Sequence, residues 1–312
     1  MKLSILTATY NRANYLKKLY ESIIDNLIDE MDIEWLIMDD GSSDNTDEII
    51  EHLMQSAKTS SSIEHFEIKY FKQQNQGKMK AINNLVDKIT GDVCLTCDSD
   101  DKLSVGAFDI IKKYSDRLLK DETVYALAFL KSDENGKISG NEFSENLHRT
   151  DEFTMYFREK MDGEKILVFN SEIRKKYRHE VEDGEKFVTE ARMYHKMDED
   201  YDIIGINEVL EIGDYKDDGY TSNFLKIYKE NPKGFYNYFK EILQRSLTGV
   251  TFEKRKYIYK HYILFATLSN QKDAILNVNG FINKIIILIL WIPGKIMTKR
   301  KFKNYTKSEE AD

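Results

Sequence analysis

Apolar and polar positions alternate along the first 120 residues in two patterns. Short apolar runs of strand length are separated by longer segments in which apolar residues recur at helical spacing. The predicted strands cover residues 3–8, 34–38, 68–71 and 92–96. The predicted helices cover residues 13–27, 45–54, 78–89 and 104–119, and Ser43 or Asp44 can cap the second of them. This alternation predicts an α/β fold with a Rossmann-like, mostly parallel sheet and helices on both faces.

Polar residues follow each of the four predicted strands. These polar tips are Thr9-Tyr10-Asn11, Asp39-Asp40, Gln76-Gly77-Lys78 and Asp98-Ser99-Asp100-Asp101. Because ligands bind beyond the carboxyl ends of the strands in such sheets, the four tips predict one binding site. The chain has neither a GxGxxG dinucleotide fingerprint nor a P-loop motif.

The fourth tip, Asp98-Ser99-Asp100-Asp101, carries the most chemistry. Carboxylates at this spacing bind a hard divalent cation, which bridges phosphate oxygens and stabilises a departing phosphate. The structural alternative is an Asp-rich turn that only caps the helix beginning near Ser104. On these residues alone the two interpretations stay open.

The pattern becomes less regular after residue 121. A strand is expected over residues 124–130, followed by polar and mixed segments to about residue 215. Beyond residue 223 the spacing is helical, most clearly over 235–247 and 257–268. We expect one domain over residues 1–222, with halves 1–120 and 121–222, and a helical C-terminal region over 223–312.

The end of the chain combines an apolar run with a basic tail. Residues 281–292 are apolar except for Asn283 and Lys284, and cations follow Pro293-Gly294. The run is shorter than the roughly 20 residues that a membrane-spanning helix needs. Cations beside an apolar helix favour an anionic membrane surface, so we expect peripheral membrane binding. The alternative is that residues 281–298 pack within the protein or in an oligomer interface.

Composition narrows the class of protein. A net charge of −8 and a pI near 5.5 argue against nucleic-acid binding. The only cysteines, Cys94 and Cys97, have the spacing of a redox or zinc motif, but they fall in an apolar run and no second pair exists. A buried strand is therefore favoured. With neither a disulfide framework nor a secretory signal at the N-terminus, a cytoplasmic location is expected.

Taken together, four motifs resemble family 2 glycosyltransferases of the GT-A fold. They are residues 3–12, residues 39–44, Asn75-Gln76-Gly77-Lys78 with Ala81 and Asn83, and Asp98-Ser99-Asp100-Asp101. The resemblance covers about residues 1–120 and points to bacterial enzymes that build capsules, teichoic acids and other surface glycans. It implies an inverting enzyme that uses a UDP-sugar, a glycan or lipid-linked acceptor and Mn²⁺ or Mg²⁺, peripheral on the inner face of the cell membrane.

The resemblance also implies roles for individual residues. Thr9, Tyr10 and Asn11 are expected to line the nucleotide pocket, and Asp40 to accept from the uracil N–H. Gly77 is expected to let the backbone pass close to the donor, and Lys78 to approach the diphosphate. The remaining donor and metal positions are Asp98, Ser99 and Asp100, with Asp100 the expected direct metal ligand.

Family members carry an acidic motif at the start of a helix in the second half, and it supplies the general base. Here the acidic stretch 180–187 precedes a helix-like run over 187–194. Glu185 fits the Gly-Glu-Lys-Phe form of the motif, whereas Asp183 fits the more common Glu-Asp letters. Either base implies inversion by one direct displacement. The structural alternative is an acidic helix start that favours the helix dipole.

Two other functions fit part of the pattern. A sugar nucleotidyltransferase has a similar sheet but carries an early Gly-rich basic loop, where this chain has Thr9-Tyr10-Asn11-Arg12. A catalytically inactive family member acting as a membrane-bound assembly partner has no need of Asp98 and Asp100. The turn at 215–221 resembles a segment that closes over donor or acceptor in related enzymes, with a plain Asp-Gly turn as the alternative.

Overall fold

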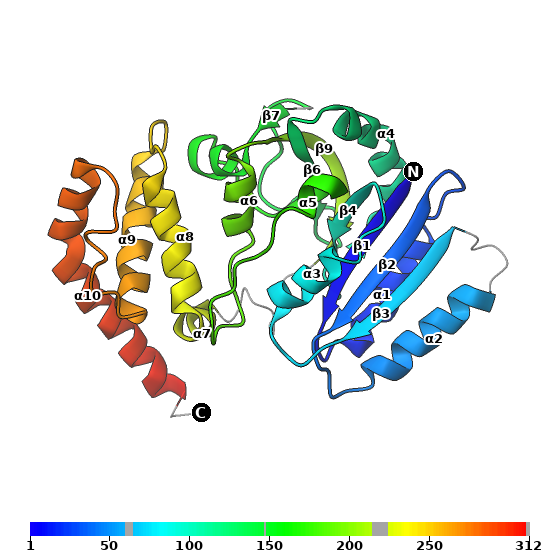
Figure 1. Ribbon diagram of the computed structural model, residues 1–312, viewed down its shortest axis with the longest axis horizontal. Coiled ribbons are helices and arrows are strands. Elements are labelled where there is room, and N and C mark those ends of the chain that lie inside the picture. The colour runs from blue at the N-terminus through cyan, green and yellow to red at the C-terminus, as the bar shows by residue number, and fades with distance from the viewer. Residues whose placement is uncertain (60–64, 147, 214–223, 310–312) are drawn as a thin grey trace. The chain divides into compact units, whose positions relative to one another are not determined.

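The computed structural model describes residues 1–59, 65–146, 148–213 and 224–309. The described residues form two compact units (Figure 1). The first unit comprises Met1–His179 and Met193–Asp214, and the second comprises Glu180–Arg192 and Tyr215–Asp312. The expected domain boundary at 222 and the turn at 215–221 lie outside the described residues.

The first unit is built on one nine-stranded sheet in the order β3-β2-β1-β4-β8-β6-β9-β5, with β7 paired to β9. The strands are β1 (Lys2–Thr9), β2 (Asp32–Asp39), β3 (Phe66–Lys72), β4 (Val93–Thr96), β5 (Lys102–Leu103), β6 (Val124–Ser132), β7 (His148–Thr150), β8 (Lys165–Asn170) and β9 (Asp202–Ile212). Strands β1 to β4 are mutually parallel, and β6 and β9 run parallel to each other. The five predicted strands and the mostly parallel sheet are confirmed.

Helices cover both faces of this sheet, as predicted. They are α1 (Ala13–Ile24), α2 (Thr46–Thr59), α3 (Lys78–Val86), α4 (Ala107–Lys120), the π-helix η1 (Thr154–Arg158), α5 (Ser171–Arg174) and α6 (Ala191–Met197). On β1, Leu3 and Ile5 pack with buried residues of α1, α2 and α4. Leu6 points to the other face and packs with residues of α3, η1 and α6. Because successive side chains of a strand point to opposite faces, β1 contributes residues to two separate hydrophobic cores.

Two local predictions from the sequence are confirmed. The Asp44 carboxylate accepts from the N–H of Thr46 at 3.2 Å and so caps the start of α2. Cys94 and Cys97 are both buried free thiols. Burial raises the pKa of the Cys94 thiol to about 11, which makes it a packing residue and not a reactive one.

A charged side chain is buried in the sheet. Glu34 on β2 is fully buried, and its carboxylate accepts from the Ser4 hydroxyl at 2.5 Å, the Thr90 N–H at 2.7 Å and the Lys69 ammonium at 2.9 Å. Desolvation alone raises the pKa of Glu34, but these hydrogen bonds outweigh it and lower the pKa to about 2. Glu34 is therefore ionised across the physiological range.

The described part of the second unit includes the helices α7 (Phe224–Glu230), α8 (Pro232–Gln244), α9 (Phe252–Leu268) and α10 (Phe281–Glu309). Aromatic rings join α8 to α9, with the ring centroids of Phe235 and Phe265 4.7 Å apart and those of Tyr236 and Tyr262 5.4 Å apart. The predicted helices at 235–247 and 257–268 are confirmed, although both begin earlier. Pro232 is the first residue of α8, where its missing N–H costs no helical hydrogen bond.

The apolar C-terminal run belongs to a helix that is longer than the run itself. Helix α10 does not end at Pro293 but continues through it. Packing on α9 supports the continuation, because a Cβ at Gly294 would lie 2.7 Å from Ile263 Cγ2. By length and composition, Phe281–Lys303 is a candidate membrane span of 23 residues, and an 18-residue window within it has a mean hydropathy of 1.6.

Candidate active site

The loops after β1 and β2 are joined by hydrogen bonds. The side-chain oxygen of Asn11 accepts from the Ser43 N–H at 2.8 Å, and the Ser42 hydroxyl accepts from the Asn11 N–H at 2.9 Å. Asn11 has a φ of 52°, a left-handed conformation that Asn tolerates better than most residues. Among the expected pocket residues, Tyr10 is 49% exposed whereas Thr9 is buried. Only Tyr10 and Asn11 present their side chains to solvent.

Asp40 organises the loop that precedes α3. Its carboxylate accepts from the N–H of Gln76 at 2.8 Å, the N–H of Gly77 at 2.7 Å and the side-chain amide of Gln73 at 2.7 Å. Gly77 has a φ of 95°, a conformation that favours glycine. Asp40 therefore fixes the backbone from which Lys78 projects. Its expected contact with uracil stays a prediction.

An ion pair joins the start of α3 to the turn after β4. The Lys78 ammonium lies 2.7 Å from Asp98 Oδ1 and 2.8 Å from Oδ2. Desolvation raises the pKa of Asp98, but the charge of Lys78 and its hydrogen bond outweigh this effect and lower the pKa below its ordinary value. Two of the four polar tips thus lie in direct contact.

The residues at this turn fit a hard divalent cation. Ligand oxygens of Asp98, Asp100 and Asp101 all lie within 4.8 Å of one another. Among the described residues, none forms a hydrogen bond or ion pair with the Asp100 carboxylate, which is half-exposed. Oxygen donors of this kind suit Mg²⁺ or Mn²⁺. The arrangement agrees with Asp100 as the expected direct ligand.

The alternative role of the acidic turn as a helix cap is contradicted. Helix α4 begins at Ala107, and the residue before it is Gly106. The Ala107 N–H donates to the side chain of Asn26 at 2.8 Å. The acidic turn instead closes on itself, since the Asp101 N–H donates to the Asp98 carbonyl at 3.1 Å.

Sequence reasoning missed a buried lysine that holds the acidic turn. The Lys131 ammonium lies 2.7 Å from Asp101, 3.1 Å from Glu211 and 3.1 Å from Glu164. Burial raises the pKa of Asp101 even with Lys131 beside it, and it raises the pKa of Glu211 well above its ordinary value. Lys131 directly follows the predicted strand 124–130. A polar residue at the end of this fifth strand is the sequence feature that could have placed Lys131 at the site.

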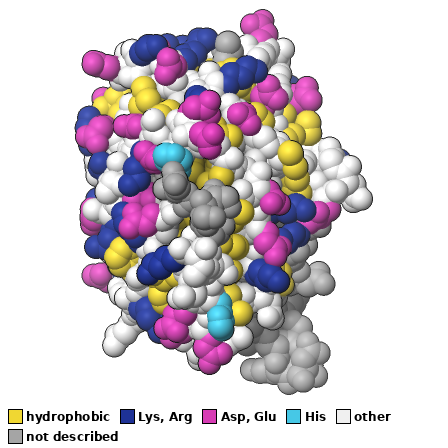
Figure 2. All heavy atoms as spheres, turned by 90° about the vertical axis from the view of Figure 1, so that its right-hand side faces the viewer, with side chains coloured by type: hydrophobic (Ala, Val, Ile, Leu, Met, Phe, Trp, Pro, Cys, Tyr) yellow, Lys and Arg dark blue, Asp and Glu magenta, His cyan; other side chains and the backbone are white. Residues whose placement is uncertain are grey.

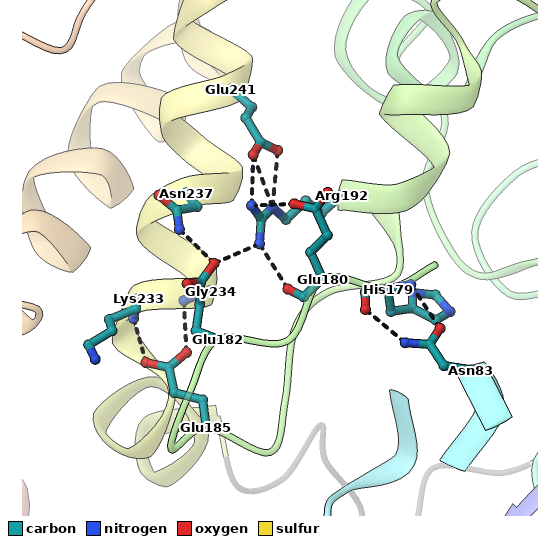
Figure 3. A network of polar contacts seen from close by, with 10 residues as sticks. All are labelled: Asn83, His179, Glu180, Glu182, Glu185, Arg192, Lys233, Gly234, Asn237 and Glu241. Carbon is teal, nitrogen blue, oxygen red and sulfur yellow. Dashed lines mark hydrogen bonds and ion pairs between the residues drawn. The ribbon is translucent and has the colours of Figure 1, made fainter. Parts of the chain in front are cut away.

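The proposed bases lie in the second unit, in a segment without regular structure that ends where α6 begins at Ala191 (Figure 3). The predicted helix start at 187 is therefore wrong by four residues, because residues 186 and 187 donate their N–H groups to the Asn231 side chain instead. Asp183 is exposed, whereas Glu185 is buried and accepts from the N–H groups of Lys233 and Gly234. Burial raises the pKa of Glu185.

Glu190 is a further candidate that the sequence prediction passed over. It is half-buried and immediately precedes α6. An acidic residue at a helix start is the position that the resemblance assigns to the base, and Glu190 meets that criterion more directly than Glu185. The sequence prediction began the helix at residue 187, which placed Glu190 inside the helix and not before its start.

Charged side chains of both signs are interspersed over the described part of one face of the molecule (Figure 2). At the proposed site, in contrast, Lys78 and Asp98 form an ion pair, and Asp100 and Asp101 lie close to Asp98. The sheet with helices on both faces is a mixed α/β fold of the GT-A type. The family model for glycosyl transferase family 2 matches residues 4–170, more than half of the chain, and the chain belongs to this family.

Curated relatives agree with this assignment. The chain is 34% identical over 128 residues to an uncharacterised glycosyltransferase of Mycoplasma genitalium, covering 40% of this chain and 41% of the relative. It is 29% identical over 178 residues to the GalNAc(5)-diNAcBac-PP-undecaprenol beta-1,3-glucosyltransferase of Campylobacter jejuni, covering 55% of this chain and 52% of the relative. The chain thus matches about half or less of the length of these relatives.

Solved structures share the fold over nearly the whole chain. S. aureus TarS 1–349 in complex with UDP has a TM-score of 0.58 at 14% identity, covering 97% of this chain and 92% of that one. The Pyrobaculum calidifontis mannosyltransferase in complex with GDP-Man and Mn²⁺ has a TM-score of 0.54 at 15% identity, covering 95% and 83%. At these identities the likeness concerns the fold alone.

Proposed function

We propose that the chain is an inverting glycosyltransferase that moves a sugar from a UDP-sugar to a glycan or lipid-linked acceptor in bacterial surface-polysaccharide synthesis. The observation that carries this proposal is the Lys78–Asp98 ion pair with Asp100 beside it. A cation and two carboxylates at the carboxyl ends of strands suit a nucleoside diphosphate and its divalent counter-ion. UDP complexes of TarS and the undecaprenol-linked acceptor in the Campylobacter enzyme's name support the choice of substrates.

Asp100 and Asp98 are the residues that would hold Mn²⁺ or Mg²⁺. When bound, such a cation stabilises the negative charge of the leaving diphosphate as a Lewis acid. Lys78 adds a fixed positive charge on the same side, and it keeps Asp98 ionised and therefore able to bind a cation. The P. calidifontis complex with Mn²⁺ supports this choice of metal.

The nucleoside would lie against the tips of β1 and β2. Tyr10 and Asn11 offer exposed side chains there, whereas Thr9 and Asp40 are buried next to them in the chain or at the end of the neighbouring strand. Gly77 has no side chain to block the donor, and Ser99 lies between the two proposed metal ligands. A uracil contact by Asp40 requires a free lone pair on a carboxylate that already accepts three hydrogen bonds.

One direct displacement accounts for inversion. A carboxylate takes the proton of the acceptor hydroxyl, the hydroxyl oxygen bonds to the anomeric carbon, and the bond from that carbon to the diphosphate oxygen breaks. UDP leaves with the electron pair. We assign the base to the 180–190 segment, with Glu185 first and Asp183 second, and with Glu190 as the comparison that the start of α6 adds.

The acceptor would be met at the inner face of the cell membrane. Much of the surface of α10 is exposed and apolar; its exposed apolar residues include Phe281, Ile282, Leu288, Ile289, Ile292 and Met297. Exposed cations follow in the same helix at Lys299, Arg300, Lys301 and Lys303. An apolar stretch beside cations favours an anionic lipid surface, each cation adding about 1 kcal/mol of attraction.

Calorimetric titration with UDP, with and without Mn²⁺, tests the proposal. We expect UDP binding that depends on the metal, and slow hydrolysis of at least one of UDP-glucose and UDP-GlcNAc. Metal-independent or undetectable UDP binding would contradict the proposed function. Turnover of a sugar 1-phosphate with a nucleoside triphosphate would instead identify a nucleotidyltransferase.

A further inference from the structure

The segment that carries the proposed bases belongs to the C-terminal helices. Residues 180–192 group with the second unit, whereas the chain on either side of them belongs to the first. Residues 180–190 contain neither helix nor strand. We call residues 180–190 the base loop. Because no regular backbone hydrogen bonding shapes it, tertiary contacts must fix its conformation.

Arg192 makes the strongest of these contacts (Figure 3). Its guanidinium is buried and forks onto the carboxylate of Glu241 on α8, with Nε 3.1 Å from both oxygens and Nη2 2.8 Å from Oε1. The same guanidinium reaches the base loop, 3.0 Å from the Glu180 carboxylate and 3.1 Å from that of Glu182. Asn237 on α8 donates to Glu182 at 2.7 Å. Arg192 therefore bridges the start of the base loop to α8.

Two further ties hold the other half of the base loop. The Glu185 carboxylate accepts from the N–H groups of Lys233 and Gly234, at 2.7 and 2.8 Å, at the start of α8. The Asn231 side chain accepts from the N–H groups of residues 186 and 187, at 2.8 and 2.9 Å. Gly234 leaves little room for a larger residue, since a Cβ there would lie 3.2 Å from Glu185 Oε2.

We propose that helix α8 is the platform that positions the general base, with Arg192 and Glu241 as positioning residues. This inference rests on the proposed function. A general base must lie within hydrogen-bond reach of the proton it removes, and small displacements cost large factors in rate. A guanidinium with three carboxylate partners holds one geometry better than a single exposed ion pair does. Because α10 packs on α9 and α9 packs on α8, the base loop and the membrane-facing helix belong to one packed unit.

The test is Glu241→Gln in the full chain, which removes the charge under Arg192 and keeps the size of the side chain. We expect kcat for UDP-sugar hydrolysis to fall about 10- to 100-fold while the Kd for UDP with Mn²⁺ stays within about 2-fold. Glu241→Asp, which keeps the charge, should recover part of the rate. The matched control is Glu253→Gln, an exposed glutamate of α9 with a single ion pair to Lys256, and it should have wild-type kcat.

A purely structural role for Glu241 predicts a lower Tm with kcat unchanged below that temperature, and this result would overturn the inference. If Glu241→Gln does not fold, Asn231→Ala tests the same platform through residues 186 and 187, with the same expected split between kcat and Kd. No turnover by the unchanged chain would overturn the proposed function and this inference together. Normal turnover in both Glu241→Gln and Asn231→Ala would overturn only the inference.

Discussion

The Lys78 ammonium contacts both oxygens of the Asp98 carboxylate, at 2.7 and 2.8 Å. Lys78 is the first residue of α3, and Asp98 follows β4, twenty residues further along the chain. This pair balances charge at the proposed diphosphate site before any ligand arrives. Removing the Lys78 ammonium should therefore change both the affinity for UDP and the pKa of Asp98.

Lys78→Met should weaken UDP binding by about 10- to 100-fold, since a charged hydrogen bond contributes about 1.5–3 kcal/mol. Loss of the ammonium also raises the pKa of Asp98, so metal-dependent binding should become more sensitive to acid. Titration calorimetry at pH 6 and pH 8 measures both effects. Lys80→Met, two residues further along α3, is the matched control and should bind UDP normally.

Asp100→Asn should abolish the dependence of UDP binding and turnover on Mn²⁺. The neutral amide keeps the size of the side chain but loses the charge that a hard cation requires. The measurement is UDP affinity across a Mn²⁺ titration. Asp109→Asn, in the first turn of α4, changes an exposed carboxylate outside the cluster and should leave the titration unchanged. A normal Mn²⁺ response of Asp100→Asn would remove Asp100 from the metal site.

Glu185→Gln should lower transfer by about 10²- to 10⁴-fold and leave UDP binding intact, because only the proton acceptor is lost. The N–H groups of Lys233 and Gly234 donate to different oxygens of Glu185, so the single amide oxygen of Gln keeps one of these bonds and the Tm should also fall. Asp183→Asn and Glu190→Gln are the comparison variants. Normal transfer by Glu185→Gln would move the base to whichever of the other two abolishes it.

Glu34 should make stability depend on pH in the acid range. Its pKa of about 2 in the folded protein lies below the usual value near 4.5, so the contribution is fully present above pH 4.5 and is lost as pH falls towards 2. The shift corresponds to about 3 kcal/mol. Urea unfolding at pH 7, 4.5 and 3 should show this loss in wild type and a flatter profile in Glu34→Gln. Glu67→Gln, an exposed residue of β3, should behave as wild type.

Membrane binding should depend on the exposed apolar side of α10. Ile289→Asp with Ile292→Asp should abolish co-sedimentation with anionic vesicles, because both side chains are about 70% exposed and contribute apolar area to the lipid contact. Replacing Lys299, Arg300 and Lys301 by Gln should weaken binding to anionic vesicles by about 100-fold and leave binding to neutral vesicles unchanged. Val105→Asp, an exposed apolar residue outside α10, is the control. Undiminished binding by the Asp variants would contradict a lipid-facing α10.

The sequence alone determined the fold of residues 1–120 and the position of the proposed donor site. Each strand of the first 120 residues is a short apolar run that ends in polar residues, and parallel strands bring such ends to one edge. That is why Asp40, Lys78 and Asp98 were predicted as one site before any contact was known. Local periodicity suffices where the elements are regular and neighbours in sequence are neighbours in space.

Only the tertiary structure decided the contacts that join distant segments. Lys131 and Glu211 meet Asp101 because β6 pairs with β9 and β9 pairs with β5, and pairing across such separations has no local signature. The base loop did not form the predicted helix at 187, because Asn231 and the start of α8 capture its N–H groups and its Glu185 carboxylate. Helix α10 passes through Pro293, where local propensity predicts an end, because packing on α9 outweighs one lost hydrogen bond. Each of these outcomes depends on a partner far along the chain.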